Sequence, residues 1–156
     1  MEKKSIKALK IVSVFTLIFI IAGIMLFAFQ TYFVFSRNGI DLNSPRGGFK
    51  LAWFIASRVF IFITAGLLIA FVKNIIKSIK RGEIFNRCNV RILFALAVVL
   101  PINAFLSDNL STVCLAADRG TIILTDTPFV YIAVTLLVAI LYKLACDAAE
   151  EQKLTV

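Results

Sequence analysis

The sequence predicts an all-α membrane protein: a bundle of four transmembrane helices with both termini on the cytoplasmic side. Three observations lead to this fold class. The chain is 60% hydrophobic and 17% charged, whereas soluble domains carry about 25% charged residues. Its apolar residues gather in four long runs, and its basic residues cluster at the ends of those runs. So few charges cannot cover a water-exposed surface, so the chain belongs to the membrane class.

Each apolar run is long enough, or nearly so, for the ~20 residues that a helix needs to cross the hydrocarbon core. Together they form a single membrane domain over residues 1–156 with spans at about 11–35, 51–72, 90–106 and 129–145. A signal peptide has an apolar region of only about 7–15 residues. The first run exceeds this length and lacks an A-x-A cleavage site, so we expect a retained helix.

The later spans carry their own boundary signals. The third run is short and contains Pro101, so we expect a kink or an irregular last turn there. Thr127 followed by Pro128 is a typical start for the fourth helix. Between these two spans, residues 121–124 read "TIIL" and are expected to form a short extended or interface-bound piece.

The distribution of Lys and Arg predicts the orientation. Twelve lie beside the N-terminus, the middle loop and the C-terminal end, and four lie beside the two remaining loops. Cytoplasmic loops carry the excess of basic residues. Both termini and the middle loop are therefore expected in the cytoplasm.

Arg58 is the one basic residue that lies more than a few positions inside a span. It lies roughly 10 Å below the outer boundary, at 1.5 Å per residue. An intramembrane charge is a candidate functional residue, facing a polar path for transport or sensing. The favoured alternatives are a side chain that reaches the interface and a structural pair with an outer polar residue: Asp108, Asp126 or Asn103.

A line of small residues follows the second helix at helical spacing: Ala52, Ala56, Gly66 and Ala70. Small residues let helix backbones approach closely in lipid. Packing within the chain is the favoured interpretation, and a homo-oligomer contact is the alternative.

The second helix is expected to continue beyond the membrane to a stop near Gly82. This extension and the following loop carry five candidate contact residues: Lys73, Lys77, Lys80, Arg81 and Arg87. Cations near the surface attract anionic headgroups at about 1 kcal/mol each. Headgroup contact is the favoured interpretation, and docking of an acidic cytoplasmic partner is the alternative. The acidic tail offers internal partners as well: Asp147, Glu150 and Glu151.

Catalytic signatures are missing from the sequence. It contains no His, no GxSxG, no P-loop and no GxGxxG, and no carboxylate lies inside an apolar run. The three Cys match no metal-binding spacing. The basic residues do not follow one water-facing element, as a nucleic-acid surface would require. We therefore predict no enzyme, no cofactor, no metal and no direct nucleic-acid binding.

Two segments resemble a bacterial inner-membrane family, domain of unknown function 2975. "IKRGEIFNRCNVRIL" is similar to its G-x-x-F-x-x-x-N-x-x-x-(I/L) segment between helices two and three, and the chain end "LYKLACDAAEEQKLTV" is similar to its closing pattern. The residues that carry the resemblance are Gly82, Phe85, Asn89, Leu154 and Thr155. It implies a four-helix protein of the inner membrane without known enzymatic activity, of a kind often encoded beside small helix-turn-helix regulators.

These observations predict a small regulatory or interaction protein of the bacterial inner membrane. Its cytoplasmic loop and tail would bind a soluble partner, for which the resemblance suggests a helix-turn-helix transcriptional regulator. One alternative is a channel or transporter subunit with Arg58 facing a polar path. Another is a structural accessory subunit that uses the small-residue line as its interface.

Overall fold

The computed structural model describes residues 3–38, 40, 43–81, 85–115 and 121–154. Its elements, in chain order, are helices α1 (Lys3–Asn38), α2 (Gly47–Lys80) and α3 (Arg87–Asp108), the π-helical turn η1 (Ser111–Leu115), and helix α4 (Thr127–Leu154). The four predicted spans lie inside α1, α2, α3 and α4 in that order. All four helices are long and apolar enough to cross a membrane, which supports a multi-pass membrane protein.

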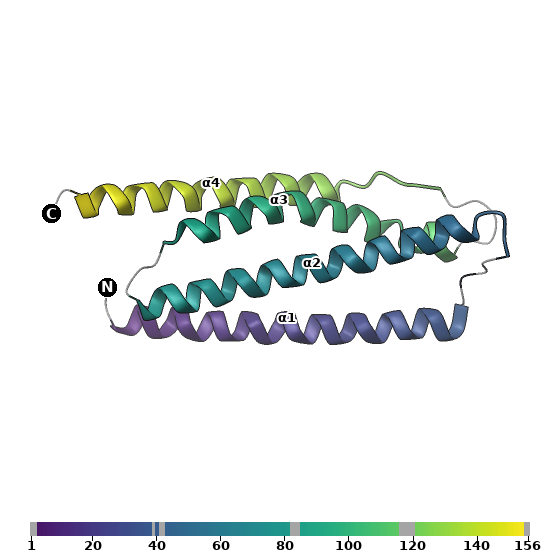
Figure 1. The fold of residues 1–156 in the computed structure, drawn as a ribbon, viewed down its shortest axis with the longest axis horizontal. Helices are drawn as coiled ribbons and strands as arrows, with labels where there is room; N and C mark the ends of the chain where they lie inside the picture. Colours follow the sequence, from purple (N-terminus) through teal and green to yellow (C-terminus); the bar gives the residue numbers. More distant parts are fainter. Residues whose placement is uncertain (1–2, 39, 41–42, 82–84, 116–120, 155–156) are drawn as a thin grey trace.

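The helices lie side by side in a row, each antiparallel to the next (Figure 1). The main contacts join helices that follow one another in the chain: α1 with α2, α2 with α3, and α3 with α4. Both termini therefore lie at one end of the molecule (Figure 1). We call this the terminal end; α2 also ends there and α3 begins there. The other end, which holds η1 and the start of α4, is called the opposite end.

The outer helices of the row expose apolar side chains. Phe19 of α1 is 74% exposed and Leu137 of α4 is 58% exposed. Burial of one such side chain away from water contributes about 1.5–3 kcal/mol, so a water-facing surface of this kind would be unfavourable. These faces are suited to contact with lipid.

Two clusters of buried side chains join the helices. One cluster, built on Leu93, Leu96 and Ala139, links α3 and α4 and contacts Phe71 of α2. The other lies at the opposite end, where Val113 and Cys114 of η1 pack on Phe54 of α2. The π-helical turn is therefore a packed element of the fold that joins the chain after α3 to α2.

Asn109 closes the opposite end. Its side chain is fully buried, and its Nδ2 donates to the carbonyl oxygens of Phe105 and Ile123, both at 2.9 Å. Its Oδ1 accepts from the backbone N–H of Ile123 at 2.6 Å. The side-chain amide of Asn109 thus forms two hydrogen bonds with the backbone of Ile123, as a neighbouring β-strand would. This segment is irregular, and α4 begins at Thr127 as predicted.

Pro101 lies inside α3, which remains helical to Asp108. The small-residue line is only partly covered: Ala52 and Gly66 are exposed, while Ala56 and Ala70 are half-buried. A Cβ at Gly66 would have no neighbour within 4 Å. Ser57 and Thr64 are buried. Each hydroxyl donates a hydrogen bond to a backbone carbonyl of α2, at 2.8 Å in both cases.

Candidate functional site

The end of α2 presents a basic stripe at the terminal end. Its four cations are all exposed and recur at helical spacing on one face: Lys73, Lys77, Lys80 and Arg81. The helix continues to Lys80, and Arg81 caps it with its N–H on the Ser78 carbonyl at 3.0 Å. Gly82, the predicted stop, lies outside the described residues. We call these four residues the α2 basic stripe.

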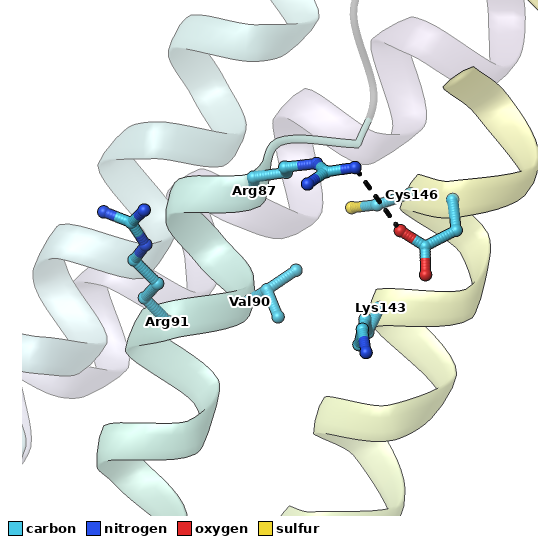
Figure 2. Close-up of a pocket in the computed structure, with 6 residues that line it drawn as sticks. Arg87, Val90, Arg91, Lys143 and Cys146 are labelled. Carbon is cyan, nitrogen blue, oxygen red and sulfur yellow. Dashed lines mark ion pairs between the residues drawn. The ribbon is translucent and has the colours of Figure 1, made fainter.

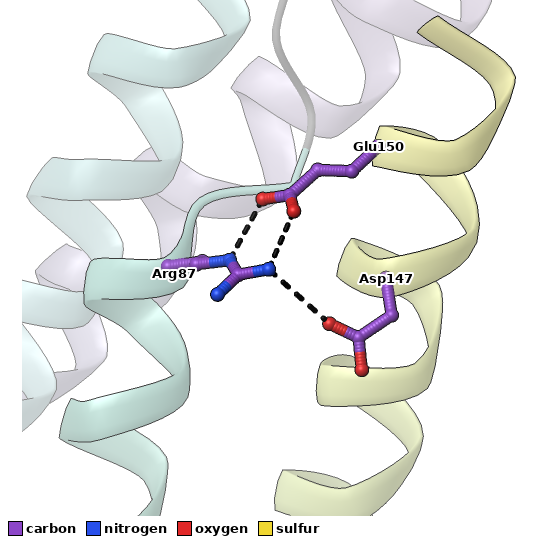
Figure 3. Close-up of polar contacts among 3 residues, drawn as sticks. All are labelled: Arg87, Asp147 and Glu150. Carbon is purple, nitrogen blue, oxygen red and sulfur yellow. Dashed lines mark hydrogen bonds and ion pairs between the residues drawn. The ribbon is translucent and has the colours of Figure 1, made fainter. Parts of the chain in front are cut away.

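Arg87 ties the start of α3 to α4 (Figure 3). Its Nε donates to Oε1 of Glu150 at 2.8 Å and its Nη2 donates to Oε2 at 2.5 Å. The same Nη2 lies 3.7 Å from Oδ1 of Asp147. This confirms that tail acids pair with the loop. Because two carboxylates already match the Arg87 charge, the α2 basic stripe is the stronger candidate for contact with a partner.

Tyr142 of α4 is the centre of a second contact at this end. Its hydroxyl accepts from Nδ2 of Asn89 at 3.2 Å and from the backbone N–H of Asn86 at 3.4 Å. Its ring packs against Phe85 and Phe71, with centroids 5.6 and 6.1 Å apart. Two residues of the family-like segment, Phe85 and Asn89, thus meet on one tyrosine.

Asn86 and Asn89 have separate roles at the start of α3. Asn86 is the N-cap, and its side chain accepts from the N–H of Cys88 at 2.8 Å. Asn89 is fully buried, and its Oδ1 has no hydrogen-bond partner within the described part of the chain. Among the other residues of the resemblance, Leu154 ends α4, while Thr155 lies outside the described residues.

Sequence reasoning missed Tyr142. One signal could have found it: of the two tyrosines in α4, Tyr142 lies near the predicted cytoplasmic boundary, at the same end of the molecule as Asn86 and Asn89. A tyrosine there needs a hydrogen-bond partner for its hydroxyl.

A groove of about 190 Å³ lies between α3 and α4 at the terminal end (Figure 2). The side chains that line it are Arg87, Val90, Arg91, Lys143, Cys146 and Asp147. A second cleft of about 190 Å³ lies near the opposite end, with Asn103, Ser107, Asp108 and Tyr131 among its lining residues. Arg58 lines neither of them.

Arg58 is enclosed by aromatic rings from two helices. Its guanidinium carbon lies 4.1 Å from the ring centroid of Phe27 in α1 and 4.7 Å from that of Phe54 in α2. Only 9% of the residue is exposed, and its Nε has no hydrogen-bond partner among the described residues. Cation–π contact with two rings explains how a charge is held here.

Two of the three expected polar partners of Arg58 are engaged elsewhere. Asp108 accepts from the hydroxyl of Thr125 at 2.5 Å, and Asn103 accepts from that of Ser107 at 3.5 Å. No ion pair within the described part of the chain involves Arg58. The predicted pairing is therefore wrong, because the partners lie on α1 and on the preceding turn of α2. This environment favours a structural role over a polar path.

The chemistry of the remaining candidate groups is limited. No group of three or more potential metal-ligating side chains occurs in the ranges that the structure describes. Cys88 is exposed, while Cys114 and Cys146 are buried. Burial raises the pKa of the Cys114 thiol above its ordinary value, and Lys50 opposes this rise, so the thiol is poorly suited to act as a nucleophile.

Comparisons with protein-family models, curated proteins and solved structures found no match to this chain. The resemblance to the 2975 family remains a prediction from the sequence. The contacts and charges of the terminal end are therefore the structural basis from which a function can be proposed.

The contacts of Tyr142 predict the effect of removing its hydroxyl. Tyr142→Phe keeps the ring packing but leaves the buried Nδ2 of Asn89 without its acceptor. An unsatisfied buried polar group costs about 1–3 kcal/mol, so we expect a loss of that order in the free energy of unfolding. The measurement is reversible unfolding in mixed micelles. Tyr131→Phe, in an exposed tyrosine of the same helix, is the matched control and should change stability little; equal losses would contradict the role of Tyr142.

The aromatic enclosure predicts coupling between Arg58 and Phe27. A double-mutant cycle of Arg58→Gln and Phe27→Leu is measured on the free energy of unfolding. It should give an interaction energy of about 1 kcal/mol, in the range of partly desolvated cation–π pairs. Phe19→Leu, in an exposed residue of α1, serves as the control partner and should not couple to Arg58. Additive effects of Arg58→Gln and Phe27→Leu would show that the rings do not hold the charge.

Proposed function

We propose that the protein is a small regulatory or interaction protein of a bacterial inner membrane, with its terminal end in the cytoplasm. It binds a soluble, acidic partner through the α2 basic stripe. The observation that carries this proposal is that four exposed cations lie on one face of a helix that extends to the end of the molecule.

The length of α2 separates the stripe from the apolar span. Its 34 residues extend about 51 Å, while the hydrocarbon core is ~30 Å thick. The stripe occupies the last turns of this helix, where the apolar run has ended. Cations in this position face water, so they can attract an acidic surface over about 8–10 Å at physiological ionic strength.

The Arg87 contact gives the neighbouring surface a defined shape. It holds the start of α3 against Glu150 of α4. Two segments that are distant in sequence therefore form one surface. Glu150 is paired with Arg87 of α3. This pairing favours recognition of a partner by the cations of α2. A preorganised surface also loses less conformational entropy on binding.

The resemblance to the 2975 family supports the choice of partner. Its members are often encoded beside small helix-turn-helix regulators, so a regulator of that kind is the proposed partner. It would bind the stripe through an acidic surface, leaving its basic DNA-binding face unoccupied. The alternative of a channel subunit gains no support from Arg58, because aromatic rings enclose this residue.

The orientation predicts the labelling of Cys88, which is the exposed cysteine among the three. With the terminal end in the cytoplasm, a membrane-impermeant maleimide should label Cys88 in inside-out vesicles and leave it unlabelled in spheroplasts. Cys88→Ser should abolish the rapid labelling, since Cys114 and Cys146 are buried. Labelling in spheroplasts would reverse the proposed orientation.

Partner binding is tested by capture from bacterial cytosol on the full-length protein in nanodiscs of neutral lipid. Lys77→Glu/Arg81→Glu should reduce the captured partner at least tenfold, because each reversal replaces an attraction by a repulsion. The matched control is Arg91→Glu/Lys143→Glu, which makes the same charge change at the same end, outside the stripe. Unchanged capture by the stripe variant would exclude the proposal, and so would equal loss with both variants.

A further inference from the structure

We infer that the groove between α3 and α4 at the terminal end is a binding site for one anionic phospholipid, whose headgroup contacts Arg91 and Lys143. This site is separate from the α2 basic stripe, and the inference goes beyond the proposed binding of a soluble partner. It requires only that the terminal end lies at a membrane surface.

The charges that line the groove are unbalanced. Arg87 is matched by Glu150 and Asp147, while Arg91 and Lys143 form no ion pair within the described residues, and both are exposed. One cation is supplied by each wall, at about the same level along the two helices (Figure 2). The two remaining positive charges complement a phosphodiester, and basic pockets between transmembrane helices are typical sites for anionic headgroups.

The groove has room for a headgroup. Its volume of about 190 Å³ is many times the roughly 10–15 Å³ that a single water needs. Val90 points from α3 toward α4 and forms part of the lining, while the guanidinium of Arg91 is turned away from α4 (Figure 2). Exposed side chains change rotamer within nanoseconds, so Arg91 can turn to the mouth of the groove when an anion enters.

The side chains below the groove favour a lipid over a free phosphate ion. One and two turns inward from Arg91, α3 carries Phe94 and Val98, which are 39% and 62% exposed. One and two turns inward from Lys143, α4 carries Ile140 and Leu136, which are 48% and 38% exposed. These positions share a helix face with the cations because of the i, i+3 and i+7 spacing. An acyl chain can therefore lie along both rows while its headgroup remains at the charged end.

The test is native mass spectrometry of the full-length protein in detergent, titrated with phosphatidylglycerol and, separately, with phosphatidylcholine. Wild type should bind phosphatidylglycerol at least tenfold more tightly. Arg91→Gln/Lys143→Gln should reduce this preference about tenfold or more, from the roughly 1 kcal/mol that each near-surface cation contributes. Each single change should reduce it several-fold, and Arg91→Lys/Lys143→Arg should retain it.

Lys77→Gln/Arg81→Gln is the matched control, because it removes the same charge at the same end outside the groove. It should leave the preference within twofold, while the groove variant should leave capture of the soluble partner unchanged. Equal effects of the two Gln variants would overturn the inference, since attraction would then be diffuse. Displacement of phosphatidylglycerol by millimolar inorganic phosphate or glycerol phosphate would also overturn it, because the groove would then be a site for a soluble anion.

Discussion

The structure depends on one constraint, the requirement that every backbone N–H and C=O in hydrocarbon finds a partner within the chain. Continuous helices meet this requirement without neighbours. This is why α1 can lie at the edge of the row with contacts mainly to α2. It is also why most of the exposed side chains along the spans of α1 and α4 are apolar. Polar chemistry is consequently concentrated where the helices end.

At each end, one buried amide satisfies backbone or side-chain groups that the helices leave open. Asn109 takes both hydrogen-bonding groups of Ile123 and fixes the irregular segment before α4. Asn89 lies against Tyr142, whose hydroxyl also accepts from the backbone just before α3. Both amides are fully buried, and burial makes an unpaired group costly. Asn109 thus holds segment 121–125 at the end of α3, and Asn89 joins the start of α3 to α4.

Local signals in the sequence predicted the four spans and the start of α4 at Thr127, because each depends on residues within a few positions. The pairing of Arg87 with tail acids was predicted because topology brings the two segments to one end. The environment of Arg58 could not be predicted: α1 is apolar on every face, so nothing marked Phe27 as its partner. Tyr142 was missed because its four neighbours come from two other segments of the chain.

The two basic surfaces of the terminal end differ in how close their positive charges lie to the apolar spans. From Lys73 to Arg81 the α2 stripe extends about 12 Å along a helix that has left its apolar span. A soluble protein can approach such a helix from the side. Arg91 and Lys143 instead lie next to exposed apolar rows on α3 and α4, where a soluble protein would have to enter the bilayer. The same residue types are therefore the basis of the proposed protein contact on one helix and of the proposed phospholipid contact between the other two.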